Sequence, residues 1–175
     1  MEILQAIHAR RSIRSYTGEK ISREEMKTIL CAGQQAPIAM GNYEDICLTV
    51  IRNAEILKRF EEVQAEVIGA NPHPFHGAPE MVVVSVNPME AQVKNMEYAN
   101  AGFILQNMSL VATALGVGSC IIYGAFDRAG TSINLNTLLS IPEDYVCLGG
   151  IVLGKTTEKY HENLNKHEIR TTFLD

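Results

Sequence analysis

The sequence predicts an α+β fold, and two patterns along its 175 residues support that class. Short apolar runs such as Met81–Val86 have the composition of strands, and longer stretches such as Gln92–Leu115 carry apolar residues at helical spacing. With 46% hydrophobic and 20% charged residues, the chain can bury an ordinary core, which excludes intrinsic disorder. Because no repeat or low-complexity linker divides it, residues 1–175 are predicted to form one domain, with a strand order that the pattern leaves open.

The N-terminal part predicts two helices. The first spans residues 2–9. Its apolar face is made of Ile3, Leu4 and Ile7. Ser22 and Glu25 have the spacing of a capping box, in which the serine hydroxyl accepts a backbone N–H and the glutamate reaches back. The second helix therefore begins here and ends before Pro37.

The middle of the chain predicts two strands separated by a helix and a loop. Ile46–Ile51 is rich in β-branched residues, and Glu55–Ile68 has the pattern of an amphipathic helix. Residues 69–77 contain several Pro and Gly residues and are predicted to be loop. Met81–Val86 is apolar throughout, which is typical of a strand in the centre of a sheet.

The stretch Gln92–Leu115 is the strongest helical signal, and it is apolar on most sides. Such a helix is buried on most sides, which in a small domain requires a central position or a partner subunit. Gly116 ends it. A strand Ser119–Ile122, a helix near residues 132–140 and a strand Tyr145–Leu153 follow.

The last segment, Lys155–Asp175, is long, polar and weakly patterned, with a possible strand at Thr171–Leu174. A tail of this kind either frays or wraps around a neighbouring subunit.

Charge and composition exclude several classes of protein. A net charge of −5 and a pI near 5.6 argue against binding to nucleic acid or to an anionic membrane surface. No apolar run is long enough for a membrane helix, and the first residues do not resemble a signal peptide. The four cysteines form no CxxC pair and are predicted to be free thiols, which indicates a cytoplasmic protein.

Hydrolytic and metal-binding motifs are missing from the sequence. It contains no GxSxG, HExxH or GxxxxGK[ST] motif. His73 and His76 have no nearby cysteine to complete a metal site and are predicted to be solvent-exposed, so no metal is expected.

The densest polar signal is Arg10-Arg11-Ser12-Ile13-Arg14-Ser15-Tyr16. In an extended conformation Arg10, Ser12 and Arg14 point to one side and can converge on a phosphate. The competing interpretation is a solvated basic turn, placed at the end of a helix where cations interact favourably with the helix dipole.

Two stretches of small residues could approach a planar ligand closely through their backbone. One is Ala36–Tyr43, directly after the second predicted helix, and the other is Gly116–Gly124, which leaves the third predicted strand. Taken alone, each is equally consistent with an ordinary turn.

Taken together and in order, these segments resemble the FMN-dependent nitroreductase family. The matching segments are Arg10–Tyr16, Ala36-Pro37, His76–Pro79, Asn100–Met108, Ala114–Cys120, Ile141–Asp144 and Val152–Gly154. The resemblance spans residues 2 to 155 and implies a nitroreductase-like fold. It also implies a central mixed, mainly antiparallel sheet flanked by helices, in an intertwined homodimer whose C-terminal extension, residues 155–175, wraps the partner.

The resemblance also implies an FMN site. By matching position, the phosphate and ribityl chain would be held by Arg10, Arg11, Ser12 and Arg14. Arg14 would have a catalytic role near the N1–C2 carbonyl edge, where a cation stabilises reduced flavin. The ring would be lined, from the other subunit, by Pro37, Ile38, Ala39, Met40 and Asn42. Tyr123 and Gly124 would aim backbone N–H groups at flavin N5 and O4, and Arg170 or Lys166 would add a phosphate contact.

The implied activity is hydride transfer from NADH or NADPH through flavin N5 to an electron-poor acceptor, such as a nitroaromatic or a quinone, by a ping-pong mechanism. The loop 69–77, with Phe75 and two histidines, is the expected lid over the acceptor. Ile38 stands where many members carry a serine, so the flavin's pyrimidine edge is expected to be read by backbone. Two alternatives are a non-catalytic homodimer that stores or delivers FMN or senses redox state, and a degenerate dimer that binds another phosphate-bearing ligand or no ligand.

Overall fold

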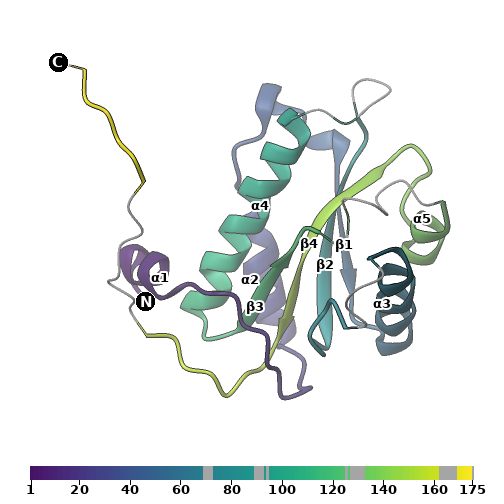
Figure 1. The fold of residues 1–175 in the computed structure, drawn as a ribbon, viewed down its shortest axis with the longest axis horizontal. Coiled ribbons are helices and arrows are strands. Elements are labelled where there is room, and N and C mark those ends of the chain that lie inside the picture. Colours follow the sequence, from purple (N-terminus) through teal and green to yellow (C-terminus); the bar gives the residue numbers. More distant parts are fainter. Residues whose placement is uncertain are drawn as a thin grey trace.

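The computed structural model describes residues 1–68, 73–88, 93, 95–124, 126, 133–161 and 169–174 (Figure 1). Its helices are α1 (Ile3–Ala9), α2 (Arg23–Gln34), α3 (Ala54–Ile68), α4 (Asn95–Ala114) and α5 (Ile133–Leu139). Its strands are β1 (Ile46–Ile51), β2 (Glu80–Val86), β3 (Gly118–Ile122) and β4 (Val146–Gly154). The helices and strands predicted up to residue 154 are therefore confirmed in type, with bounds that differ by a few residues; Gln92 and residue 132 lie outside the described part.

The four described strands form one sheet in the order β1-β2-β4-β3, and each neighbouring pair is antiparallel. This agrees with the mainly antiparallel sheet that was predicted. Every residue of β2 is buried, which confirms its central place. β1 and β3 are the two edge strands of the described sheet. The segments that adjoin them therefore lie at opposite edges.

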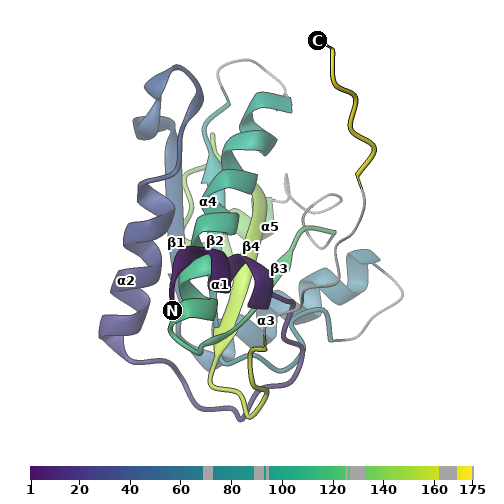
Figure 2. The same cartoon turned by 90° about the vertical axis from the view of Figure 1, so that its left-hand side faces the viewer.

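Helices cover both faces of the sheet. α2 and α4 pack on one face and α3 and α5 on the other (Figures 1 and 2). Because strand residues alternate, Val82 and Val84 pack under α2 and α4, and Val83 packs under α3 and α5. Two hydrophobic cores result, one on each face.

A buried ion pair joins the start of α2 to the sheet. The Glu80 carboxylate is fully buried, pairs with Arg52 and accepts the Ile21 backbone N–H at 2.7 Å. Arg52 in turn donates to the Ile21 carbonyl at 2.9 Å. Because the charge of Glu80 is matched by a guanidinium and a backbone donor, its burial is tolerated.

The apolar face predicted for the first helix does not face the core. Ile3, Leu4 and Ile7 are exposed, and the helix packs through Ala6 and Ala9 instead. Small alanines allow α1 to approach α4, so the larger side chains are left on the outside, where they form an apolar surface.

The C-terminal segment divides into two parts. Residues 155–160, expected to be weakly structured, are held against the body: the Lys155 N–H donates to the Glu19 carbonyl at 3.0 Å, and the Tyr160 hydroxyl donates to the Val117 carbonyl at 2.8 Å. Residues 169–174 extend away from the body (Figure 1). The predicted strand Thr171–Leu174 is wrong for the single chain, because these residues form no strand pairing with any described part of the chain.

Two further findings concern thiols and membrane spans. Cys31, Cys47, Cys120 and Cys147 are all free, as predicted, and the last two are buried. None of the helices in the described part of the chain combines the length and apolarity needed to cross a bilayer.

Candidate functional site

The basic segment after α1 runs in an extended conformation beside β3. Ile13 is fully buried, and its N–H donates to the Ser119 carbonyl at 2.8 Å. Its carbonyl accepts the Tyr16 hydroxyl at 2.8 Å. Since side chains alternate along extended backbone, burying Ile13 turns Ser12 and Arg14 to the opposite side, together with Arg10.

The side chains of Arg10, Ser12 and Arg14 have hydrogen-bond donors available for a ligand. Arg14 is exposed, and Arg10 and Ser12 are half-buried. Among the residues that the structure describes, neither Arg10 nor Arg14 has an ion-pair partner. Two guanidiniums without an acidic partner among the described residues, and a hydroxyl on the same side of a fixed backbone, are a donor set suited to a phosphate.

Arg11 lies apart from this group. Its guanidinium donates to the Glu158 carboxylate at 3.1 Å and to the Lys159 carbonyl at 2.9 Å. In this arrangement Arg11 holds the first part of the C-terminal segment against the body. It could join a phosphate site only by exchanging these partners.

Tyr123 and Gly124 lie directly beyond β3, whose last paired residue is Ile122. The Tyr123 carbonyl accepts the Phe126 N–H at 2.8 Å, and Phe126 is buried, so the turn is fixed. The Tyr123 ring makes an edge-to-face pair with Tyr98 of α4, with ring centroids 6.0 Å apart. Sequence reasoning missed Tyr98, because no local pattern links it to Tyr123.

The loop after α2 forms a second half of the predicted site. Pro37 and Met40 are exposed, and Ile38, Ala39 and Asn42 are half-buried. Met40 and Gly41 both adopt left-handed backbone conformations, with φ of 59° and 71°. The Ala39 N–H donates to the Asn100 side chain at 3.0 Å. Asn100 is one of several polar residues of α4, so only the structure shows that it anchors this loop.

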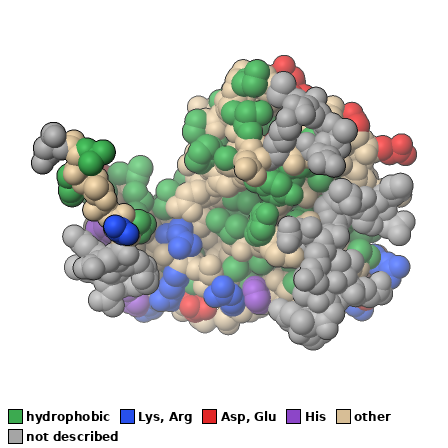
Figure 3. Space-filling view, turned by 45° about the horizontal axis from the view of Figure 1, so that its top comes forward, with side chains coloured by type: hydrophobic (Ala, Val, Ile, Leu, Met, Phe, Trp, Pro, Cys, Tyr) green, Lys and Arg blue, Asp and Glu red, His purple; other side chains and the backbone are tan. Residues whose placement is uncertain are grey.

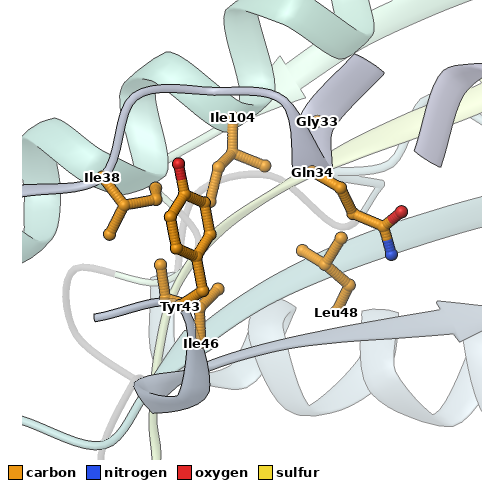
Figure 4. A pocket seen from close by; sticks show the side chains of 7 residues that line it. All are labelled: Gly33, Gln34, Ile38, Tyr43, Ile46, Leu48 and Ile104. Atoms are coloured by element: carbon orange, nitrogen blue, oxygen red, sulfur yellow. The ribbon is translucent and has the colours of Figure 1, made fainter. Parts of the chain in front are cut away.

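A cavity of about 420 Å³ lies next to this loop (Figure 4). It is lined by Gly33, Gln34, Ile38, Tyr43, Ile46, Leu48 and Ile104. The Tyr43 ring lies between Ile38 and Ile104, and its hydroxyl donates to the Ala36 carbonyl at 3.2 Å. Tyr43, although exposed, thus supports the loop through this hydrogen bond.

The two halves lie on opposite edges of the sheet. Arg10–Arg14 and Tyr123 lie at β3, and Pro37–Asn42 leads through Tyr43–Asp45 into β1. β2 and β4 lie between these edges. With strands about 4.8 Å apart, the edges are separated by three spacings, or about 14 Å.

The described part of the loop predicted as a lid is fixed. Phe75 is buried, with its ring centroid 4.9 Å from that of Phe60, and its N–H donates to the Glu61 carboxylate at 3.1 Å. The expectation that Phe75 belongs to a lid is therefore wrong, because moving it would open the core. Residues 69–72 lie outside the described part.

The two histidines of this loop differ. His73 is exposed, as predicted, and lies 3.7 Å from the Glu61 carboxylate. His76 is half-buried, contrary to prediction. Burial and the nearby Arg14 charge lower the pKa of His76, and the Glu61 charge opposes them. Within the described residues, no group of three or more His, Cys, Asp or Glu side chains is placed to hold a metal ion.

The two expected C-terminal phosphate contacts are Arg170 and Lys166. Arg170 is exposed and belongs to the segment that extends away from the body (Figure 1). Lys166 lies outside the described residues.

Comparison with known proteins supplies the family. The sequence model described as the nitroreductase family matches residues 7–155. An Archaeoglobus fulgidus protein described as an NADH dehydrogenase/NAD(P)H nitroreductase is 33% identical over 154 residues, which cover 87% of this chain and 84% of that protein. The NAD(P)H-dependent FMN reductase of Bacillus subtilis is 26% identical over 172 residues, which cover 90% of this chain and 67% of that protein.

The fold agrees with solved structures. The crystal structure of a nitroreductase with bound FMN from Bacteroides fragilis superposes with a TM-score of 0.79 and 26% identity, over 100% of both chains.

Proposed function

The chain belongs to the nitroreductase family, and from that premise we propose that it is an FMN-dependent oxidoreductase. It takes a hydride from NADH or NADPH and passes it to a small electron-poor acceptor, such as a nitroaromatic or a quinone, in a ping-pong cycle. The names of its relatives, an NAD(P)H nitroreductase and an NAD(P)H-dependent FMN reductase, support this activity.

The observation that carries the proposal is the donor set of the basic segment. The FMN phosphate is a dianion, and Arg10, Ser12 and Arg14 offer charged and neutral donors on one side of a backbone that buried Ile13 holds in place. Because neither arginine is engaged by a described carboxylate, binding the phosphate breaks no ion pair with a described residue. The residues present therefore fit the group.

When bound, FMN supplies the hydride chemistry, and the chain supplies position and charge. Arg14 is proposed to stabilise negative charge at the N1–C2 edge, and the backbone N–H groups of Tyr123 and Gly124 are proposed to orient the N5–O4 edge. Their fixed turn, closed by the Phe126 N–H, suits this role because it costs no reorganisation.

We propose a homodimer in which the two halves of each site come from different subunits. The separation of the Pro37–Asn42 loop from Arg10–Arg14 by the width of the sheet supports this arrangement. So do exposed apolar side chains that a single chain leaves uncovered. They are Ile3, Leu4 and Ile7 of α1, Phe103 of α4 and Leu115 directly after it.

The same proposal treats residues 1–175 as one FMN-binding domain whose end lies on the partner. Three side chains in this segment are each more than 80% exposed: Ile169, Phe173 and Leu174. Exposing apolar surface to water is unfavourable, and contact with a second subunit would bury it. Arg170 would then approach a phosphate in the partner's site. Free cysteines are consistent with a cytoplasmic location, which we include in the proposal.

The first test is the visible spectrum of the purified protein before and after anaerobic addition of NADH or NADPH. Oxidised-flavin bands that bleach with either nucleotide are the expected result. Flavin that resists bleaching would favour the storage or sensor alternative. A colourless protein that does not take up added FMN would contradict the proposal.

A further inference from the structure

Two tyrosines from distant parts of the chain meet at the end of β3. Tyr98 belongs to α4, and Tyr123 follows Ile122, the last paired residue of β3. Their ring centroids lie 6.0 Å apart and the ring planes meet at 72°, so the edge of one ring lies against the face of the other. This contact fixes the direction of the two side chains relative to each other.

Both rings are open to solvent although they touch. Tyr98 is 36% exposed and Tyr123 is 50% exposed. Phe60 and Phe126, which also pair edge-to-face, are instead buried in the core. The tyrosine pair therefore keeps ring surface on which a further planar group can pack.

The two elements that carry the pair are well fixed. Tyr98 stands on a helix of 20 residues. The Tyr123 carbonyl accepts the N–H of buried Phe126 at 2.8 Å, which closes the turn after β3. A surface built on fixed elements loses little conformational entropy when a ligand packs on it, so it can favour one shape of ligand over another.

The pair lies along the same strand as the basic segment. Ile13 donates its N–H to the Ser119 carbonyl of β3. Tyr123 is four residues after Ser119, a distance of about 13 Å along extended chain. Figure 3 shows a face of the molecule on which hydrophobic side chains gather next to a group of Lys and Arg side chains. A phosphate held by the basic segment and a ring packed on the tyrosines would therefore occupy separate places.

We propose that Tyr98 and Tyr123 form a stacking surface that selects planar, electron-poor aromatic acceptors. The inference rests on the proposed function, which places the reactive N5–O4 edge of the flavin at the Tyr123 backbone. The faces of a phenol ring carry negative charge, whereas the ring of a nitroaromatic or a quinone is depleted of π electrons, so offset stacking between the two is favourable. Tyr98 is then a specificity-determining residue that lies outside the set proposed to bind FMN.

The test compares Tyr98→Leu, which removes the ring, with the matched control Tyr98→Phe, which keeps the ring and removes only the hydroxyl. The probe is 4-cyanopyridine, a planar electron-poor ring without a nitro or quinone group. Its dissociation constant is measured with the oxidised, FMN-loaded protein from the change in flavin absorbance. We expect Tyr98→Leu to raise this constant by about 3- to 10-fold and Tyr98→Phe to keep the wild-type value.

An unchanged dissociation constant in Tyr98→Leu would overturn the inference, and so would FMN-loaded wild type that does not bind 4-cyanopyridine. An equal loss in Tyr98→Phe would also overturn it, because the hydroxyl rather than the ring would then make the contact.

If Tyr98→Leu does not fold, fluorine NMR of protein labelled with 3-fluorotyrosine decides the question. Of the resonances from the chain's six tyrosines, the one missing from Tyr98→Phe must shift when 4-cyanopyridine is added to the wild type, and an unshifted resonance refutes the proposal. A wild type that binds no FMN would contradict the proposed function instead, so the two failures are distinguishable.

Discussion

A single buried isoleucine determines which residues of the basic segment can act together. Burial of Ile13 turns Arg10, Ser12 and Arg14 outward. Arg11 contacts Glu158 instead. The four basic-segment residues assigned to one cofactor by family resemblance thus divide into three that can converge on a phosphate and one that already has an acidic partner.

Replacing both outward arginines tests this division. Arg10→Ala combined with Arg14→Ala is expected to give soluble but colourless protein, because each charge-assisted hydrogen bond to a phosphate contributes about 1.5–3 kcal/mol. FMN affinity, measured by fluorescence titration of the apoprotein, should fall by about 100-fold or more. Arg23→Ala, which removes an exposed arginine at the start of α2, is the control. Stoichiometric FMN in the double variant would refute the phosphate assignment.

Among the elements, α2 has a capping box, predicted from local sequence, that also makes a contact with a distant part of the chain. Its predicted capping box is confirmed: the Ser22 hydroxyl accepts the Glu25 N–H at 3.1 Å, and the Glu25 carboxylate accepts the Ser22 N–H at 2.7 Å. The same carboxylate accepts a hydrogen bond from Lys155 at 2.7 Å. One side chain therefore caps the helix and holds the residue that follows β4.

The variant Glu25→Gln separates these two roles, since glutamine keeps the cap and loses the charge. Burial raises the pKa of Glu25, but the hydrogen bonds from Lys155 and Ser22 outweigh it and leave that pKa below its usual value. Stability from a lowered carboxyl pKa is present above the unfolded pKa, near 4.3, and is lost as the pH falls through the folded pKa.

The expected result is a loss of about 1 kcal/mol in the free energy of unfolding at pH 7, measured by urea denaturation. The difference from wild type should shrink below about pH 4. Glu24→Gln, at the exposed neighbouring position, should change little at either pH. A Glu25→Gln deficit that is the same at both pH values would show that the ion pair contributes nothing.

On the scale of the whole molecule, the C-terminal segment divides into two parts that differ in their contacts. Residues 155–160 are attached to the chain's own β3 edge through Tyr160 and Arg11. Residues 169–174 have no such attachment to the described part of the chain, and they expose three large apolar side chains. Residues 155–160 therefore stabilise their own subunit, and we propose that residues 169–174 contact the partner subunit.

Truncation after His161 removes the second part and keeps the first. We expect the dimer to dissociate at concentrations where the full chain remains associated, as followed by sedimentation equilibrium, because the apolar contacts of Ile169, Phe173 and Leu174 are lost. The matched control is a triple substitution of these three residues by serine in the full-length chain, which should weaken the dimer in the same direction. Unchanged association in both would exclude the wrapping role.

The helices, the strands and the family resemblance follow from the sequence by itself. The signals are local: apolar periodicity, the Ser22–Glu25 capping box and the glycines after helices. The structures that they predict are formed by local sterics and hydrogen bonds. Ile46–Ile51 was predicted with its observed bounds for this reason.

Only the tertiary structure decided which of these local features face one another. Phe75, expected to belong to a lid, is buried in the core, and its backbone N–H donates to the Glu61 carboxylate. The inward face predicted for α1 lies outside because alanines pack more closely against α4. Such outcomes depend on contacts between residues far apart in the chain, and local periodicity carries no information about them.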